Sequence, residues 1–276
     1  MISARIRPVW CTIILTVLTL AQQSNSQAQG LVWSIPEPGT SVKYAGTYSQ
    51  VTFRPQSSKG DLSLEWRSTL ETRCLERVTA NYHGEDVPCV WLEFEAVTGQ
   101  LVDGSLESGP GGQRIYKVLV PESAINGLEF FRSEVPNAYL PVVEGYEKIG
   151  DGKVERFKLP VLQVFPLLTQ LLINDRLKDE GQENVTVTTG EYPAQKVTCQ
   201  TGLEDPSTRT TNQSQIWISD QIPFGLVKWQ IRIDREVKTP ADTRDQFQKS
   251  SEISIDMQAV EITSNATSKL STPAAE

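Results

Sequence analysis

Five stretches of the chain alternate apolar and polar residues with a period of two, and this pattern restricts the fold more than any other feature. In the longest stretch, Val227, Trp229, Ile231 and Ile233 alternate with polar residues. Successive side chains of a strand point to opposite faces, so each stretch predicts a strand with one buried and one solvent-facing side. The other four stretches lie at 62–66, 90–95, 185–188 and 253–258. Residues 115–120, which read IYKVLV, form a further predicted strand. Together they predict an antiparallel sheet with one face in water.

Turn-forming residues separate these stretches at 81–86, 109–112 and 150–152. Residues 161–173 break the pattern, because they read VLQVFPLLTQLLI and are rich in leucine with little alternation. This composition predicts a helix of about three turns, which Pro166 either begins or kinks. Since such a helix would be apolar on nearly all sides, we expect the sheet to cover most of it. The predicted fold class is therefore mainly β (α+β).

The first 28 residues contain the three parts of a secretory signal peptide in the expected order. Arg5 and Arg7 are their only charged residues, an apolar run follows at 9–21, and small residues suit cleavage after Ala28. The run is shorter than the roughly 20 residues that span a bilayer as a helix. We therefore expect residues 1–28 to be removed and the protein to be exported, to the periplasm or out of the cell. The alternative is a short buried helix at the start of a cytosolic domain.

After cleavage 248 residues would remain (276 − 28), which suits one large β domain. We predict a single β-rich domain at 29–262 and a disordered tail at 263–276, because the tail is small and polar with no apolar period. No segment after the leader is apolar for long enough to span a membrane. Loss of the two leader arginines takes the net charge from −8 to −10. This charge disfavours nucleic acid and anionic membrane surfaces as partners.

The mature chain would keep Cys74, Cys89 and Cys199, an odd number that allows at most one internal disulfide. Cys74 and Cys89 flank a turn and are the leading candidates, in a loop whose closure would contribute about 3 kcal/mol. A bond between Cys89 and Cys199 is the alternative. Cys11 lies near the start of the leader's apolar run, where it does not suit lipid attachment. The cysteine spacing fits no zinc pattern and the chain has one histidine, so no metal or cofactor is predicted.

Two features could carry catalysis, although no complete catalytic motif is present. His83 is the only histidine, so any Ser–His or Cys–His nucleophile would need it, yet its polar turn predicts a solvated surface residue. Glu93 and Glu95 lie two apart on a predicted strand and share one face at roughly 6–7 Å. Two close carboxylates are the catalytic groups of most glycoside hydrolases, and Trp91 on the same face could stack on a sugar. The competing interpretation is an exposed acidic face of the sheet.

The tryptophans divide between the two faces of the predicted sheet. Trp66 and Trp229 fall on apolar faces and are expected in the core. Trp91 and Trp217 fall on the opposite faces of their strands, where they either pack over the other side of the sheet or offer a stacking surface to a ligand. We favour packing, because large aromatic side chains are mostly buried.

Four phrases of the sequence read SIPEPGTSVKYAGTYSQ from Ser34, RIYKVLVPE from Arg114, YLPVVEGYEKIG from Tyr139 and WISDQIPFGLVKWQI from Trp217. Together these phrases resemble a family of exported proteins of unknown function from planctomycete-type bacteria. The resemblance covers most of the mature chain. It implies an exported protein and assigns no catalytic residue.

A second resemblance concerns one hairpin. The triplets WIS at 217–219, PFG at 223–225 and LVK at 226–228 are similar to the late hairpin of the lipoprotein-carrier (Lol-like) half-barrels. That resemblance implies a curved antiparallel sheet or half-barrel with one or two helices packed on it, around an apolar cavity that holds acyl chains. Residues 161–173 would form the lid. The chain departs from the carriers because it has no evident long amphipathic N-terminal helix, and this departure concerns the transport activity more than the sheet.

The sequence therefore leaves three functional hypotheses. The first is an exported, non-catalytic β module that binds an apolar ligand or an envelope protein, since a concave sheet can leave an apolar cavity. The second is a glycan-acting acid/base hydrolase that uses Glu93 and Glu95. The third is a structural component of the envelope with no small ligand, which an extended exposed apolar patch would favour.

Overall fold

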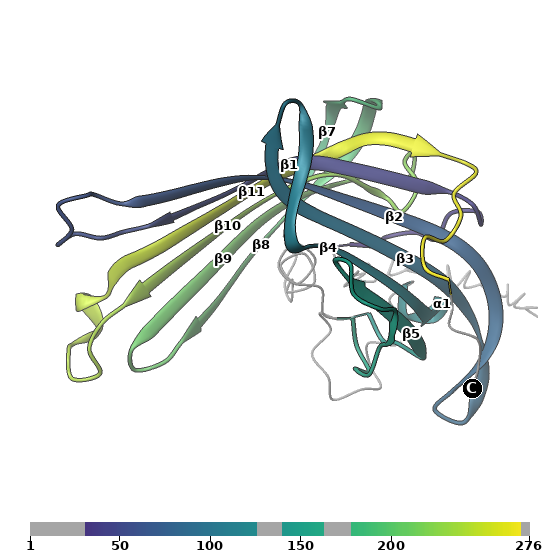
Figure 1. Ribbon diagram of the computed structural model, residues 1–276, viewed down its shortest axis with the longest axis horizontal. Helices are drawn as coiled ribbons and strands as arrows, with labels where there is room; N and C mark the ends of the chain where they lie inside the picture. The colour runs from purple at the N-terminus through teal and green to yellow at the C-terminus, as the bar shows by residue number, and fades with distance from the viewer. Residues whose placement is uncertain (1–30, 126–139, 163–177, 272–276) are drawn as a thin grey trace, which may run out of the picture.

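The computed structural model describes residues 31–125, 140–162 and 178–271, and in them the chain forms one antiparallel sheet of eleven strands (Figure 1). The strands are β1 (Ser41–Thr52), β2 (Leu62–Tyr82), β3 (Glu85–Val102), β4 (Ser105–Pro121), β5 (Glu144–Ile149), β6 (Glu155–Arg156), β7 (Lys178–Val187), β8 (Gly190–Glu204), β9 (Thr208–Ile218), β10 (Leu226–Val237) and β11 (Gln248–Thr263). Each predicted strand coincides with one of these elements, except that Thr188 of the predicted strand at 185–188 lies in the turn after β7. The mainly β class predicted from the sequence is confirmed.

The first and last strands of the chain pair with each other in the middle of the sheet. β1 is antiparallel to β11 on one side and to β2 on the other. One arm of the sheet continues from β2 to β6 in chain order, and the other continues from β10 back to β7. Every neighbouring pair is antiparallel, so each arm is a series of hairpins, and the β1–β11 ladder holds the two arms side by side (Figure 1).

The sheet is curved, and its two arms share one core. Leu92 and Val118 of one arm belong to the same connected group of buried side chains as Val197 and Ile216 of the other. The edge strand β7 also approaches β10 and β11, which are not its ladder partners. We call the side of the ladders that carries Leu92, Tyr44, Trp229 and Ile216 the inner face and the opposite side the outer face.

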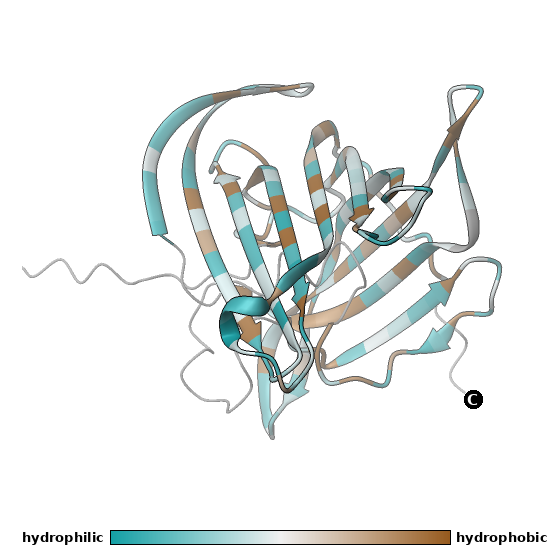
Figure 2. Ribbon diagram, turned by 90° about the vertical axis from the view of Figure 1, so that its left-hand side faces the viewer, coloured by the Kyte–Doolittle hydropathy of each residue, from teal (hydrophilic) through white to brown (hydrophobic). Residues whose placement is uncertain are grey.

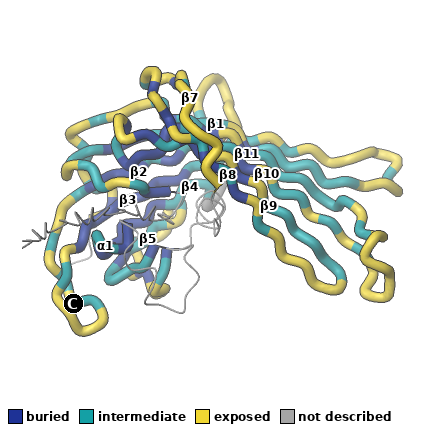
Figure 3. The backbone as a smooth tube through the Cα atoms, turned by 180° about the vertical axis from the view of Figure 1, so that it is seen from behind, coloured by how far each residue is buried: buried dark blue, intermediate teal, exposed yellow. Residues whose placement is uncertain are grey.

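Apolar residues recur along the strands of this sheet as alternating bands (Figure 2). At the centre of the inner face Trp229 is fully buried and meets Tyr44 edge-on, with ring centroids 5.1 Å apart. The Tyr44 hydroxyl donates a 3.0 Å hydrogen bond to the Leu226 carbonyl oxygen, which satisfies the phenol inside the core. Burial is concentrated in the curved half, whereas the free ends of β8 to β11, β1 and β2 project into solvent (Figure 3).

The prediction of one or two helices packed on the sheet is not supported. The described ranges contain only a four-residue helix, α1 (Glu122–Ile125), and a 3₁₀ turn at Arg244–Gln246, and no helix in them is long and apolar enough to cross a membrane. Most of the predicted helix at 161–173 lies outside the described residues. Its first two residues are extended, since Val161 forms a bridge with Pro141 and the Leu162 amide donates to the Leu140 carbonyl oxygen at 2.8 Å. A leucine-rich run without a clear period does not distinguish a helix from a buried extended chain.

The predicted disorder of residues 263–276 is wrong for the part that the structure describes. Leu270 is only 3% exposed, and Ser268 and Lys269 are hydrogen bonded to glutamates of β3. A small polar composition predicts disorder because it lacks apolar burial, but here charged partners far away in the sequence hold the segment. The predicted signal peptide at 1–28 and the last five residues lie outside the described ranges.

The predicted disulfide is not formed, because Cys74, Cys89 and Cys199 are all buried and none of them takes part in a disulfide. Cys74 lies in the main core on the inner face, whereas Cys89 packs with Trp91 and Leu119 on the outer face. Two cysteines whose side chains point to opposite faces of a sheet cannot be bridged. The alternative bond from Cys89 to Cys199 is absent as well, since Cys199 lies on β8 in the other arm.

Burial should make these thiols unreactive in the folded protein. It raises the pKa of Cys74 to about 11 and also raises the pKa of Cys89. We expect a thiol reagent at pH 8 to leave Cys74 and Cys89 unmodified in the native mature protein and to modify all three cysteines in urea without prior reduction. Mass spectrometry of the alkylated protein checks this. A protein mass two units lower, with only one of the three cysteines modified in urea, would reveal a disulfide.

Gly46 marks the closest approach of β1 to β11. A Cβ atom at this position would overlap the backbone oxygen of Asp256, whereas one at Gly202 would lie 3.7 Å from the Thr210 oxygen. We expect Gly46→Ala to lower the free energy of unfolding by about 3 kcal/mol, because the overlap forces two paired strands apart. Gly202→Ala is the matched control and should change it by less than about 1 kcal/mol. Urea unfolding measures both, and equal stability of the two variants would contradict the close packing of β1 and β11.

Candidate functional site

The predicted acidic pair lies on the outer face of the sheet and is buried in an ion-pair cluster. Arg73 of β2 lies opposite Glu93 of β3 in the ladder, and Glu71 lies opposite Glu95. Arg73 Nη1 donates to Glu93 at 2.9 Å and its Nη2 donates to Glu95 at 2.8 Å, while Glu71 forms a third ion pair with Nη2. Arg73 is 2% exposed, Glu93 0% and Glu95 7%. One guanidinium therefore holds three carboxylates on neighbouring strands.

The C-terminal segment closes this cluster from outside. Glu93 accepts hydrogen bonds from the Ser268 hydroxyl at 2.6 Å and from the Lys269 amide at 2.9 Å. The Lys269 ammonium donates to Glu95 at 2.6 Å, and the Gln113 side chain of β4 donates to the other oxygen of Glu95 at 2.8 Å. Both carboxylates are thus saturated by donors, as buried charges require.

The environment of the cluster favours the charged forms of Glu95 and Arg73. Burial by itself would raise the pKa of Glu95, but hydrogen bonds from Arg73, Lys269 and Gln113 hold it below the usual carboxyl value. Burial by itself would lower the pKa of Arg73, yet the hydrogen bond that Arg73 donates to Glu95 and the charges of the three glutamates raise it. A lowered carboxyl pKa is the mark of a structural ion pair in this setting.

These properties do not suit glycoside hydrolysis. A glycosidase needs one carboxylic acid that stays protonated, with a raised pKa, and room for sugar between the two groups. Here the pKa of Glu95 moves in the opposite direction, and Arg73 and the C-terminal segment occupy the space around both carboxylates. The hydrolase hypothesis is therefore not favoured. The interpretation of an exposed acidic face is wrong too, since Glu93 and Glu95 are both buried.

The other predicted catalytic candidate is remote from this cluster. His83 is exposed at the β2–β3 turn with a positive φ of 53°, and its ring lies against Tyr82 at 4.1 Å between centroids. Gly84 and eight residues of β3 separate it from Glu93, about 30 Å along an extended chain. Within the described ranges, no three His, Cys, Asp or Glu side chains are arranged to hold a metal ion.

The two tryptophans predicted on the faces opposite to the apolar faces of their strands pack and do not present a stacking surface. Trp91 lies under the Lys117 ammonium, 5.1 Å from the ring centroid, and its ring is stacked with Tyr146. Trp217 lies between Lys196 and Lys228, at 5.0 and 5.2 Å, and its indole N–H donates to Glu183. Both rings are less than a tenth exposed. Trp91 belongs to the outer-face group of buried residues and Trp217 to the main core, and cation–π contacts and burial account for both positions.

A different surface on the inner face has the character of a binding site. We call it the inner tract and define it as Leu64, Trp66, Ile233 and Ile253. These residues lie on the strand ends that project beyond the core, and each is partly exposed. In the ladders Trp66 pairs with Tyr48, and Tyr48 pairs with Ile255. Two residues farther toward the projecting strand ends, Ile233 pairs with Ile253. Trp66 and Tyr48 stack with centroids 5.5 Å apart. The tract is a partly uncovered continuation of the apolar core.

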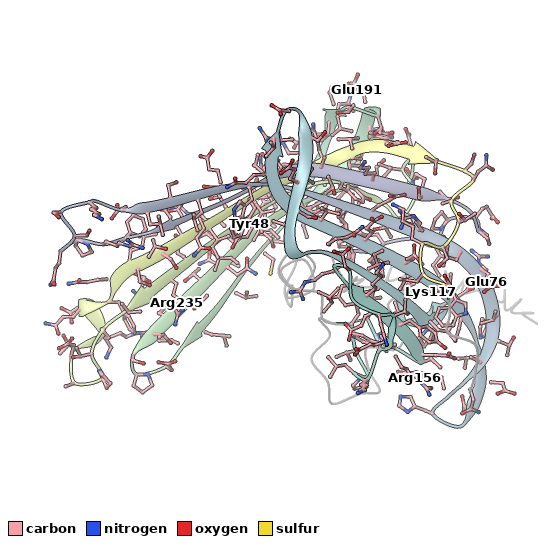
Figure 4. The ribbon with its side chains drawn as sticks, in the orientation of Figure 1. Tyr48, Glu76, Lys117, Arg156, Glu191 and Arg235 are labelled. Carbon is pink, nitrogen blue, oxygen red and sulfur yellow. The ribbon has the colours of Figure 1, made fainter. Side chains whose placement is uncertain are left out.

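One charged residue lies at the outer end of the inner tract. Arg235 follows Ile231 and Ile233 on β10 with the same strand parity, and its ladder partner on β11 is Ser251. Figure 4 shows Tyr48 where the two arms meet and Arg235 farther out on the projecting strands. Its side chain is exposed and takes part in none of the ion pairs found among the described residues. The alternating pattern predicted Ile233 and Ile253 on the buried sides of their strands and did not single out Arg235. Alternation indicates which face of a strand is apolar, but not how far along the strand other side chains cover that face.

Comparison with known proteins yields no family for this chain. No protein-family model matches it, and no curated protein matches it. Two solved structures each align with 84% of this chain and 99% of their own chains. One is a candidate lipoprotein of Parabacteroides distasonis, at 11% identity and a TM-score of 0.34. The other is a candidate exported protein of Bacteroides fragilis with a YmcC-like fold, at 10% identity and a TM-score of 0.29. At these TM-scores neither likeness bears on the function of this chain.

The ion-pair cluster makes a prediction about stability and pH. Removing the cation with Arg73→Leu would leave three carboxylates facing one another, so we expect a loss of about 3 kcal/mol in the free energy of unfolding at pH 7. The folded pKa of Glu95 is below its unfolded value, so its contribution is present above about pH 4.5 and is lost as the pH falls. The penalty of Arg73→Leu should therefore shrink at acid pH.

Urea unfolding at pH 7 and pH 4 measures this difference. Arg232→Leu is the control, because Arg232 pairs with Asp234 and Glu252 at an exposed site and such pairs contribute little. A penalty for Arg73→Leu that is small at pH 7, or constant with pH, would show that the cluster does not hold β2 and β3 together.

Proposed function

We propose that this protein is an exported, non-catalytic β module whose inner tract binds an amphiphile, with the ligand's apolar chain along the tract and an anionic head group near Arg235. The observation that carries this proposal is the inner tract itself, an apolar surface continuous with the core but only partly covered. The partly exposed side chains of Ile233 and Ile253 on one side of β1, and of Leu64 and Trp66 on the other, cost free energy in water, and a ligand that covers them recovers it.

The dimensions and charge of the surface support an amphiphile over a wholly apolar ligand. Four residues of β10 separate the row of Ile231 from Arg235, a distance of about 13 Å along an extended strand. The apolar part of the surface therefore ends at a guanidinium that can bind a carboxylate or phosphate group. Binding sites of this kind combine an apolar lining with a few polar groups that fix the ligand's orientation.

Export is part of the same proposal and rests on the order of the first 28 residues. An envelope protein that covers the inner tract with an apolar segment is the other partner that the surface could take. The two possibilities differ in what the protein carries when it is purified from its own host.

A single charge on the inner tract should abolish ligand binding. We expect Ile253→Glu to weaken the binding of cis-parinaric acid, a fluorescent fatty acid, at least tenfold, because a carboxylate placed among apolar side chains repels both the chain and the acid head. Ser254→Glu is the matched control, since Ser254 is the next residue on β11, lies on the outer face and is the ladder partner of Arg232. Fluorescence titration measures the affinities of the three proteins.

Two outcomes would count against the proposal. If the wild-type protein fails to bind the fatty acid, or if Ile253→Glu and Ser254→Glu reduce binding equally, the inner tract is not the site. If native mass spectrometry of protein from its own host shows an envelope protein and no amphiphile, the partner is a protein and the ligand proposal is wrong.

A further inference from the structure

The ion-pair cluster on the outer face has the contacts of a recognition site as well as those of a structural one. We propose that the outer face of β2 to β4 recognises an extended, lysine-bearing polypeptide, and that the chain's own C-terminal segment fills this site and competes with other occupants. We call residues 266–271 the tail segment. This site is on the opposite face from the inner tract and does not depend on the function proposed for it.

Glu93 recognises the backbone of the tail segment. Its carboxylate accepts hydrogen bonds from the Lys269 amide at 2.9 and 3.1 Å and from the Leu270 amide at 3.3 Å. It also accepts one from the Ser268 hydroxyl at 2.6 Å. Two successive amides can point at one carboxylate only when the bound chain has one conformation and one direction. Hydrogen bonds to a buried, charged acceptor are also among the stronger ones.

Three successive side chains of the tail segment each occupy a separate position in the site. The Ser268 hydroxyl binds Glu93, and the Lys269 ammonium reaches Glu95 at 2.6 Å and Glu71 at 3.8 Å. Leu270 is 3% exposed although the residues on either side of it are exposed. The site therefore recognises a hydroxyl, an ammonium and an apolar group in that order, a pattern that many extended segments can present.

The site carries a net negative charge. Without the tail segment it contains one cation, Arg73, and three carboxylates, Glu71, Glu93 and Glu95, for a formal charge of −2. Lys269 reduces this to −1. A site that keeps a negative charge when occupied favours cationic segments and disfavours acidic ones.

The tail segment is attached through a small number of residues. Residues 264–271 form no strand, and Ser264, Asn265 and Thr267 are exposed. The backbone contact nearest the start of the segment is the hydrogen bond from the Ala266 amide to the Gly39 carbonyl oxygen, at 2.7 Å. The contacts with Glu93 and Glu95 come from three residues, and the same three groups on another chain could replace them.

The experiment removes the tail segment and supplies it as a separate molecule. A variant that ends at Thr263 is titrated with a fluorescent peptide of residues 264–271, and anisotropy measures binding. We expect the peptide to bind this variant at least tenfold more tightly than it binds the full-length mature protein, whose own tail competes. Changing Lys269→Ala in the peptide should weaken binding about tenfold, as expected for loss of a charged hydrogen bond. Asn265→Ala in the peptide is the control and should have no effect.

Circular dichroism shows whether the shortened variant is folded. If it is folded and does not bind the peptide, or binds the Lys269→Ala peptide as well as the unchanged one, the proposal is overturned. If it is unfolded, the test uses the full-length variant Lys269→Ala/Leu270→Ala, which should bind the unchanged peptide at least fivefold more tightly than the wild-type protein does. No gain in that variant would mean that the tail segment is only a structural part of the sheet, and the proposal would be wrong.

Discussion

The pairing of the first strand with the last holds this structure together. Every other ladder joins strands that are neighbours in the chain, whereas β1 and β11 are separated by most of it. Their close approach at Gly46 and the packing of Tyr44 against Trp229 lie where the two arms meet. Curvature brings side chains of both arms into one core, and the same curvature leaves the strand ends beyond that core with an apolar inner face that is only partly covered.

The two faces of the sheet are stabilised by different interactions. The inner face is apolar, so its contribution comes from surface removed from water. The outer face of β2 to β4 buries Arg73 with three glutamates, an arrangement whose Coulombic gain is largely offset by desolvation unless every donor and acceptor is satisfied. Satisfaction here requires Ser268 and Lys269, so the end of the chain completes a cluster that begins on β2. This dependence explains why a segment of small polar residues is ordered.

The sequence predicts the strands well and their partners poorly, for a physical reason. Alternation reports the face of each side chain, so the strands around Trp66, Phe94 and Trp229 could be identified from single residues and their neighbours. Alternation says nothing about residues far apart in the chain, so the ion pair between Arg73 and Glu93 and the docking of Leu270 could not be anticipated. The same limit explains the error at Cys74 and Cys89. Their spacing suggested a hairpin pair, but the register places one cysteine on each face.

The central claim is that the curved sheet leaves its inner tract uncovered in order to hold the apolar part of an amphiphile. A crystal structure of the protein with a fatty acid that carries bromine on its chain tests this claim most directly, because anomalous scattering locates the bromine atoms without reference to the protein. We predict bromine beside Trp66, Ile233 and Ile253, with the carboxylate toward Arg235. Bromine found only on the outer face, or none bound to the protein at all, would contradict the account.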